Sequence, residues 1–285
     1  MSSSFLSHRE KNQLLAAISI DDWGHIESHL EWVEMPAGST LQEAGYSLRH
    51  VYFPVTAVVS LVSTMLDGAT VEVAVVGSEG MVGVDAFMGS SSANNGTPAT
   101  GTVMAQNSAM VVRGGYGYRM RAQAIAHQAK RSEQVMHQLL NYTRTLFFHM
   151  SQTSACNRHH SIDQQLARWM LAHLERQPDN QLHITQERIA SMLGVRREGV
   201  TTGTLRLQKA GVIRNGRGQI SVLDRAGLEA RTCECHDVIR SAYERLKNDA
   251  VLQAPLMQGI EFDQAIQTRV PGRAGTPSGA DSSMH

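Results

Sequence analysis

Residues 184–202 read ITQERIASMLGVRREGVTT, and this stretch decides the fold of the domain around it. Thr185 can begin a helix, because its hydroxyl can accept a hydrogen bond from a free backbone amide. Gly194 can adopt the positive φ that a tight turn between two helices requires. Ala190 is small enough for the helices to cross closely, and Val200 can pack the second helix onto the first. This spacing predicts a helix-turn-helix.

A glycine-rich segment follows the second helix. Residues 211–222 read GVIRNGRGQISV, in which two short apolar runs flank Asn-Gly-Arg-Gly, a composition typical of a β-hairpin. A helix-turn-helix followed by such a hairpin, or wing, predicts duplex DNA as the partner. The alternative is an amphipathic helix pair in an ordinary helical domain, and that alternative does not account for the wing.

The second helix and the wing carry side chains that suit DNA. Arginine can bond to guanine O6 and N7, glutamate can accept from cytosine N4, and basic side chains bind phosphates. We expect base contacts from the start of the second helix and added positive charge from its end and from the wing. The residues concerned are Arg196, Arg197, Glu198, Thr201 and Thr202, followed by Arg206, Lys209, Arg214 and Arg217.

Composition sets wider bounds. The 285 residues carry 26 basic and 26 acidic side chains, so DNA affinity must come from a local patch rather than from net charge. This length favours two domains. There is no run of 18 apolar residues and no N-terminal signal pattern, so we expect a cytoplasmic protein without a membrane span. The cysteines, Cys156, Cys233 and Cys235, fit a reducing compartment rather than a disulfide framework.

Short β-rich runs fill the sequence between residues 31 and 113, after a helical segment at residues 6–30 with a break expected at Asp21 and Asp22. Turn residues separate the runs, including Asp67-Gly68 at a hairpin position. Many short strands with regular turns predict a small antiparallel β-barrel. The clearest runs are residues 51–54, 57–64, 71–76 and 102–105, and residues 90–101 form a polar loop.

Residues 118–158 contain neither proline nor glycine, and their apolar residues recur at helical spacing. One apolar stripe includes Leu139, Tyr142 and Leu146. A neighbouring stripe consists of Met136, Leu140, Phe147 and Met150. Such a helix needs two surfaces to bury against, and we expect its own barrel and a partner's copy, with dimerisation contacts through the first stripe. Burial of the whole helix within one chain is the alternative. A further helix is expected at residues 226–246.

A β-barrel, a long helix and a winged helix-turn-helix, in this order, resemble the Crp–Fnr superfamily of bacterial transcription regulators. The resemblance covers residues 10–245 and is strongest at residues 184–223. The sequence PAGSTLQEAG at residues 36–45 is similar to the first barrel hairpin of that family. ACNR at residues 155–158, together with residues 162–171, looks like the hinge and first helix of its DNA-binding domain.

The resemblance implies an α+β fold with a cyclic-nucleotide-binding-like jelly-roll barrel. In that family the barrel binds an effector, the long helix dimerises and the winged domains read a palindrome, so we expect an allosterically controlled homodimer. RNA polymerase is a further partner if the protein is an activator. The expected domains are residues 1–117 (effector-sensing β-barrel), 118–158 (dimerisation helix region), 159–250 (winged helix-turn-helix) and 251–285 (disordered tail).

Single positions extend the resemblance into the DNA-binding domain. Arg197 and Glu198 match the base-reading pair of the family, and Thr185 and Gln186 match positions that touch phosphate. Thr202 stands where several members have a second base-reading arginine. This departure leaves the reading of the inner half-site bases open.

The effector site departs from that of members that bind cyclic AMP. Those members hold the ribose with a glutamate and the cyclic phosphate with an arginine. Here Val84 stands in place of the glutamate, and residues 93–97 contain no arginine. Because a buried phosphate needs a compensating cation, we expect that cyclic AMP does not bind. An unknown small-molecule effector stays open, and the candidate residues for it are Gly80, Gly83, Val84, Asn94 and Asn95.

The cysteines bear on two metal-dependent modes. Oxygen-sensing members of the family hold an iron–sulfur centre with N-terminal cysteines, whereas no cysteine precedes Cys156 here. Cys233, Cys235 and His236 have a spacing at which metals can be bound. Such side chains splay apart on a helix, however, and the sequence offers no evident fourth ligand. We therefore expect ordinary thiols, no metal site and no cofactor.

Two other classes of function compete with DNA binding. A metal-dependent oxygenase or isomerase of the cupin type needs several inward-facing histidines, and His50 is the only histidine between residues 33 and 110. We expect His159 and His160 to be a solvated pair or a capping feature rather than metal ligands. No nucleophile–base arrangement or phosphate-binding glycine loop stands out, so we expect no enzymatic activity. The second class is an effector-binding barrel module that acts through protein partners rather than DNA.

Overall fold

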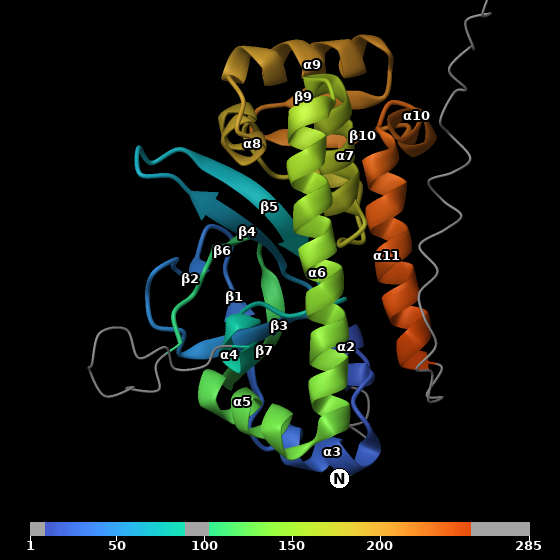
Figure 1. The fold of residues 1–285 in the computed structure, drawn as a ribbon. Coiled ribbons are helices and arrows are strands. Elements are labelled where there is room, and N and C mark those ends of the chain that lie inside the picture. The colour runs from blue at the N-terminus through green and yellow to red at the C-terminus, as the bar shows by residue number, and fades with distance from the viewer. Residues whose placement is uncertain (1–8, 89–102, 252–285) are drawn as a thin grey trace, which may run out of the picture. The chain divides into compact units, whose positions relative to one another are not determined.

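Two antiparallel sheets make up the N-terminal half of the computed structural model, which describes residues 9–88 and 103–251 (Figure 1). The first sheet has the strand order β1-β7-β3, and the second has the order β2-β6-β4-β5. The strands are β1 (Glu31–Met35), β2 (Thr40–Gln42), β3 (His50–Pro54), β4 (Val58–Thr64), β5 (Thr70–Val76), β6 (Ser108–Arg113) and β7 (Gly115–Arg121). The strands predicted at residues 51–54, 57–64 and 71–76 are therefore confirmed.

The two sheets share one apolar core. Phe53 of β3 and Leu61 of β4 belong to the same buried cluster. Side chains of β3 largely alternate between this core and the outside, whereas β4 is buried on both faces, with Val58 and Val62 in two other buried clusters. Within the described residues, hydrogen bonds pair the strands into two antiparallel sheets around this shared core, which is the jelly-roll form of the barrel that the sequence predicts. The run expected at residues 102–105 contributes an isolated bridge between Ser47 and Met104 rather than a strand.

The N-terminal helices are shorter than the sequence pattern suggested. Helix α2 spans Gln13–Ala16 and α3 spans Ile20–Glu27, so the break lies before Asp21 and Asp22 rather than at them. Ser19 caps α3, accepting a hydrogen bond from the Asp22 amide at 3.1 Å. Both aspartates then lie in the first turn of α3, where the positive end of the helix dipole favours carboxylates.

The long helical segment also begins later than expected. Tyr118 belongs to β7, because residues 115–121 pair with both β1 and β3 as the central strand of their sheet. Helix α5 (Ala122–Arg131) follows, and α6 (Glu133–His159) begins after a break at Ser132. The Ser132 hydroxyl caps α6 by accepting from the Val135 amide at 3.2 Å. The domain boundary expected between residues 117 and 118 thus falls inside a strand.

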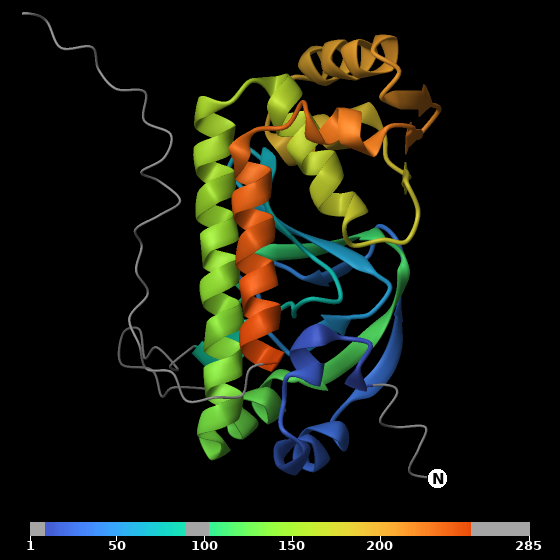
Figure 2. The ribbon, with the colours of Figure 1, turned by 90° about the vertical axis from the view of Figure 1, so that its right-hand side faces the viewer.

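Helix α6 packs against the core of its own chain and against α11 (Figures 1 and 2). Leu139, Tyr142 and Leu146 are at most 2% exposed and belong to the sheet core. Their assignment as dimerisation residues was therefore wrong, since a partner cannot reach them. The neighbouring stripe faces outward, with Leu140 47% and Phe147 70% exposed.

The C-terminal half contains a second apolar core, built mainly around α7. The strand order β8-β10-β9 forms a small antiparallel sheet beside it. The helix expected at residues 226–246 is two helices with a break at residues 230–233. The elements are α7 (Ile162–Leu174), β8 (Gln181–Leu182), α8 (Gln186–Leu193), α9 (Arg197–Lys209), β9 (Ile213–Gly216), β10 (Gln219–Val222), α10 (Arg225–Glu229) and α11 (Glu234–Val251).

Some expectations fall on residues that the structure does not describe. The loop predicted at residues 90–101 and, apart from residue 251, the tail predicted at residues 251–285 lie outside the described ranges. Within the described ranges, no helix combines the length and the apolar character that crossing a membrane requires.

Candidate nucleic-acid interface

Helices α8 and α9 form the helix-turn-helix that the sequence predicts. Thr185 caps α8, and its hydroxyl accepts from the Arg188 amide at 3.2 Å. Gly194 ends α8 with a φ of 66°, the left-handed conformation that favours glycine. Ala190 and Val200 are buried where the two helices cross. The local signals in the sequence and the observed turn therefore agree.

Two residues predicted to face DNA also hold α8 and α9 together. The Thr201 hydroxyl lies 2.8 Å from Gln186 Oε1, and Gln186 Nε2 donates to the Thr204 hydroxyl at 3.1 Å. These bonds fasten the start of α8 to the middle of α9. Sequence reasoning missed this role, because only the fold shows that the two segments face each other.

The start of α9 presents charged side chains to solvent. Arg196 precedes the helix, Arg197 and Glu198 lie in its first turn, and Thr202 lies one turn further on; all four are exposed. In the part of the chain that the structure describes, no ion pair engages Arg196, Arg197 or Glu198. A helix start with free basic groups attracts phosphate, because backbone amides and the helix dipole point the same way.

The wing adds a second basic position beside α9. Arg217 lies in the turn between β9 and β10 and is exposed, and Gly218 beside it has a φ of 71°. Arg214 of β9 is exposed as well. Arg206, in contrast, is paired with Asp163 of α7 at 2.7 Å, so it contributes less free charge than the sequence suggested.

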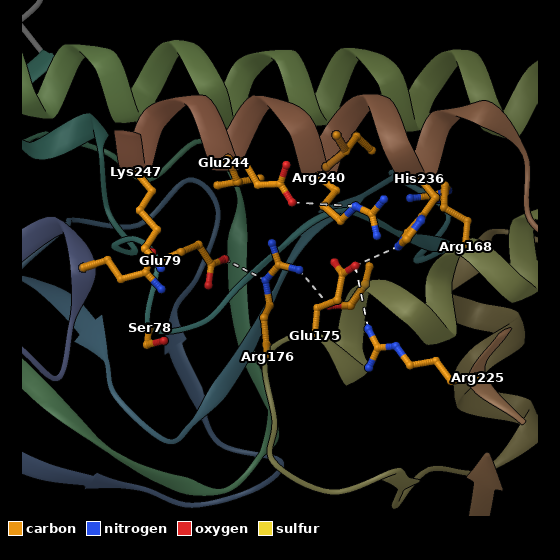
Figure 3. Close-up of a pocket in the computed structure, with 14 residues that line it drawn as sticks. Ser78, Glu79, Arg168, Glu175, Arg176, Arg225, His236, Arg240, Glu244 and Lys247 are labelled. Atoms are coloured by element: carbon orange, nitrogen blue, oxygen red, sulfur yellow. Dashed lines mark hydrogen bonds and ion pairs between the residues drawn. The ribbon is translucent and has the colours of Figure 1, made fainter. Parts of the chain in front are cut away.

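Several polar contacts connect this domain to the sheets, among them an ion pair between Arg113 of β6 and Asp179 at 3.0 Å. The hydroxyls of Thr70 on β5 and Ser191 on α8 lie 2.6 Å apart. His173 of α7 lies 3.1 Å from a carboxylate oxygen of Glu72, which also accepts a hydrogen bond from Ser60. Arg176, which follows α7, makes a further contact: the Arg176 Nε atom lies 2.6 Å from a carboxylate oxygen of Glu79 (Figure 3).

A cavity of about 360 Å³ lies between α7, α11 and the segment that carries Glu79 (Figure 3). Glu175 accepts from His236 at 2.8 Å within its wall. Burial would raise the pKa of Glu175, but the hydrogen bond and charge of His236, together with nearby arginines, outweigh burial and lower it. Arg168 lines the same cavity, is only 4% exposed, and has no hydrogen-bond partner for its Nε among the described residues.

A buried histidine of α6 lies close to this cavity. His149 Nδ1 is 3.2 Å from the hydroxyl of Tyr243 on α11. Burial, with a smaller effect from Arg176, Arg168 and His173, lowers the pKa of His149 well below its usual value. The folded structure therefore favours the neutral form of the His149 imidazole.

Three of the predicted effector residues, Gly80, Gly83 and Val84, are among the described residues and lie against the core. A Cβ atom on Gly80 would lie 2.2 Å from the Tyr142 ring, so Gly80 is needed for the close approach of α6. Val84 packs against the sheet core, and Gly83 adopts a φ of 96°. The remaining two candidates, Asn94 and Asn95, lie outside the described residues.

Comparisons with known proteins agree with this geometry. The family model of the Crp-like helix-turn-helix domain matches residues 164–231. A putative Crp/Fnr family transcriptional regulator from Eubacterium rectale has a similar fold, with a TM-score of 0.60, 17% identity, and coverage of 80% of this chain and 99% of that one. The chain has the Crp/Fnr fold and a Crp-like helix-turn-helix domain.

Other Crp/Fnr-like structures are similar at comparable levels. FixK2 from Bradyrhizobium japonicum gives a TM-score of 0.57 at 15% identity, covering 72% of this chain and 98% of that one. The c-di-GMP-responsive regulator CLP of Xanthomonas campestris gives 0.55 at 12% identity, covering 72% and 99%. No curated protein matches the chain. These findings confirm the resemblance in fold and in the helix-turn-helix domain that the sequence predicts.

Proposed function

We propose that this Crp/Fnr-type protein is a sequence-specific DNA-binding transcription regulator that reads a palindromic operator as a homodimer. The observation that carries the proposal is the exposed start of α9, where Arg197 and Glu198 are free of intramolecular ion pairs among the described residues. This end of a recognition helix can enter the major groove, where arginine and glutamate can discriminate guanine and cytosine. Arg217 on the wing is placed to bind the neighbouring backbone.

The exposed stripe of α6 supports the homodimer. Leu140 and Phe147 lie seven residues apart, two helical turns, on the same face of the helix and outside the core of their own chain. Met136 and Met150 flank them as half-buried neighbours. A second copy of α6 would cover this stripe in a two-fold arrangement. Two recognition helices would then address half-sites about 34 Å apart, one turn of duplex DNA.

The contacts between the sheets and the DNA-binding domain support allosteric control. Glu72 and Glu79 meet α7 and the residues after it, and Thr70 meets α8. A change in the sheets could therefore reach the winged domain through these polar contacts. The effector proposed for this control is a small molecule other than cyclic AMP. If the protein activates transcription, RNA polymerase is the further partner.

Selection of bound duplexes from a random library, using the purified full-length chain, tests the proposal. We expect enrichment of a palindrome with two G·C-containing half-sites centred about one helical turn apart. Enrichment of a single, non-repeated half-site would contradict the homodimer but keep the DNA-binding function. No enrichment at low salt, where phosphate contacts are strongest, would contradict DNA binding and favour a module that acts through protein partners.

A further inference from the structure

Four potential metal ligands meet where the end of α6 approaches the start of α11. Cys156 lies in the last turn of α6, and His160 follows the helix as its C-cap, with its backbone amide donating to the Cys156 carbonyl at 3.0 Å. Cys233 and Cys235 belong to the segment that begins α11. One ligand atom from each of the four side chains lies within 4.8 Å of all the others. The chain thus brings together residues that are 77 positions apart in sequence.

We propose that Cys156, His160, Cys233 and Cys235 bind one thiophilic divalent ion of the zinc class in a closed tetrahedral site. Around such an ion, Zn–S bonds of about 2.3 Å place two sulfur atoms about 3.8 Å apart. The Sγ atoms of Cys156 and Cys233 are 3.5 Å apart, and Cys235 Sγ is 3.5 Å from His160 Nδ1. Three sulfurs and one imidazole nitrogen are a common ligand set for structural zinc.

The geometry favours one ion over an iron–sulfur cluster. In a four-iron cluster each cysteine binds a different iron atom, so the ligand atoms lie farther apart than around a single ion. Here all four ligand atoms lie within 4.8 Å of one another. The three cysteines are buried and His160 is half-buried, and the four side chains would fill all positions of a tetrahedral ion, as expected of a structural rather than a catalytic site.

Neighbouring side chains orient these ligands. His160 Nε2 lies 3.3 Å from a carboxylate oxygen of Glu234, which leaves Nδ1 to face the three sulfurs. A carboxylate on the remote nitrogen of a metal-binding histidine fixes the ring and makes it a better ligand. The Gln152 amide donates to Cys235 Sγ at 3.1 Å. His236, the ligand considered from sequence, instead turns away to Glu175.

The charge near the cluster also fits a loaded site. Three thiolates and one divalent ion carry a net charge of −1, and a buried anion needs a nearby cation. Arg168 is almost fully buried and lines the same cavity as His236, which follows Cys235 in the chain. Within the described residues no ion pair neutralises Arg168. A thiolate-rich metal centre would supply the negative charge that this arginine otherwise lacks.

The expected consequence is structural. The ion would join the last turns of α6 to the start of α11, and residues 161–232, which contain the winged helix-turn-helix, lie between these two points. Binding free energy of such sites contributes directly to folding, because the unfolded chain does not hold the ligands together. The proposed DNA-binding function does not depend on this site, so the two can fail separately.

Metal analysis of the full-length chain, purified under reducing conditions, tests the site. We expect inductively coupled plasma mass spectrometry to find about one zinc-class ion per chain. The ion should be lost in the variants Cys156→Ser, Cys235→Ser and His160→Gln. His159→Gln is the matched control, because His159 adjoins His160 but is exposed and outside the cluster. Replacing the ion by Co²⁺ should give the near-ultraviolet thiolate charge-transfer bands and the visible bands of tetrahedral cobalt.

Three results would overturn the proposal. One is a wild-type chain that is folded and reduced, contains no metal and shows no tetrahedral spectrum when titrated with Co²⁺. Another is a stoichiometric Cys156–Cys233 disulfide in protein kept under reducing conditions. The third is equimolar iron and sulfide. If the cysteine variants fail to fold, the cobalt titration of the wild-type chain and the paired histidine variants still decide the question.

Discussion

Glu72 on β5 and His173 on α7 face each other at 3.1 Å with both side chains less than a tenth exposed. The contact joins the sheets to the winged domain inside the protein, where neither group can exchange its partner for water. Removing one member of a buried pair leaves the other desolvated, which costs about 3–5 kcal/mol.

The first prediction follows from this pair. Glu72→Leu should lower the free energy of unfolding by several kcal/mol, because His173 and Ser60 lose their acceptor. The double variant Glu72→Leu/His173→Leu should recover part of the loss, since it leaves no unpaired imidazole. Urea denaturation of the three proteins measures both effects. Additive losses in the double variant would contradict coupling between the two side chains.

The second prediction concerns base reading. Arg197→Ala should weaken binding to the selected operator by about 1–3 kcal/mol and relax the preference at one G·C pair. Arg240→Ala is the control, because it removes the same charge from α11, where Arg240 is exposed and bonded to Asp237. Gel-shift titrations on operator and scrambled DNA give the comparison. An equal loss on both duplexes would assign Arg197 to phosphate contacts.

The third prediction concerns assembly. Phe147→Asp should give a monomer that binds operator DNA poorly, because it places a charge in the proposed interface while leaving the core intact. Leu66→Asp is the matched control at a fully exposed apolar residue of the β4–β5 turn. Light scattering after size exclusion measures the mass. Leu146→Asp should instead unfold the chain, and a dimeric Phe147→Asp protein would contradict the interface.

The fourth prediction concerns pH. The pKa of His149 is lowered in the folded state, whereas an unfolded histidine titrates near 6.5. As pH falls below about 6.5, His149 is protonated in the unfolded chain but not in the folded chain. The free energy of unfolding therefore declines by up to about 1.4 kcal/mol per pH unit. His149→Gln should show a shallower decline between pH 6.5 and 5 in denaturation experiments. His137→Gln, at an exposed position of α6, should retain the wild-type slope.

The fifth prediction concerns cyclic AMP. Val84 offers no acceptor for a ribose hydroxyl and packs against the core, so we expect no heat of binding in a calorimetric titration. The operator affinity should be the same with and without the nucleotide. A micromolar dissociation constant coupled to tighter operator binding would contradict this expectation without affecting the DNA-binding proposal.

The sequence predicted those features whose causes are local. The cap at Thr185, the left-handed Gly194 and the hairpin at Asp67-Gly68 depend on a few adjacent residues, and the structure shows all three. The sequence pattern wrongly predicted Tyr118 as the start of the long helix. Its true place in β7 depends on pairing with β1 and β3, which come from distant parts of the chain and leave no local signal.

Other features depend on tertiary contacts that no periodicity reveals. Leu146 and Phe147 lie on two apolar stripes of similar quality, and only the packing of α6 decides that Leu146 is buried and Phe147 exposed. His160 was expected to be solvated or to cap a helix; it caps the end of α6 and also lies among the three cysteines. Its cysteine neighbours at residues 233 and 235 come from a helix that the sequence alone could not place beside α6.

The hydrogen bond between Thr70 and Ser191 has a consequence for how a signal could travel. It attaches the β4–β5 hairpin to α8, and Gln186 attaches α8 to Thr201 of α9. A displacement of the hairpin would thus steer the recognition helix through two short links, with no need for α6 to slide or for the partner subunit to respond. In a dimer, each subunit would then control the position of its own recognition helix, so the two subunits could respond to a signal independently of each other.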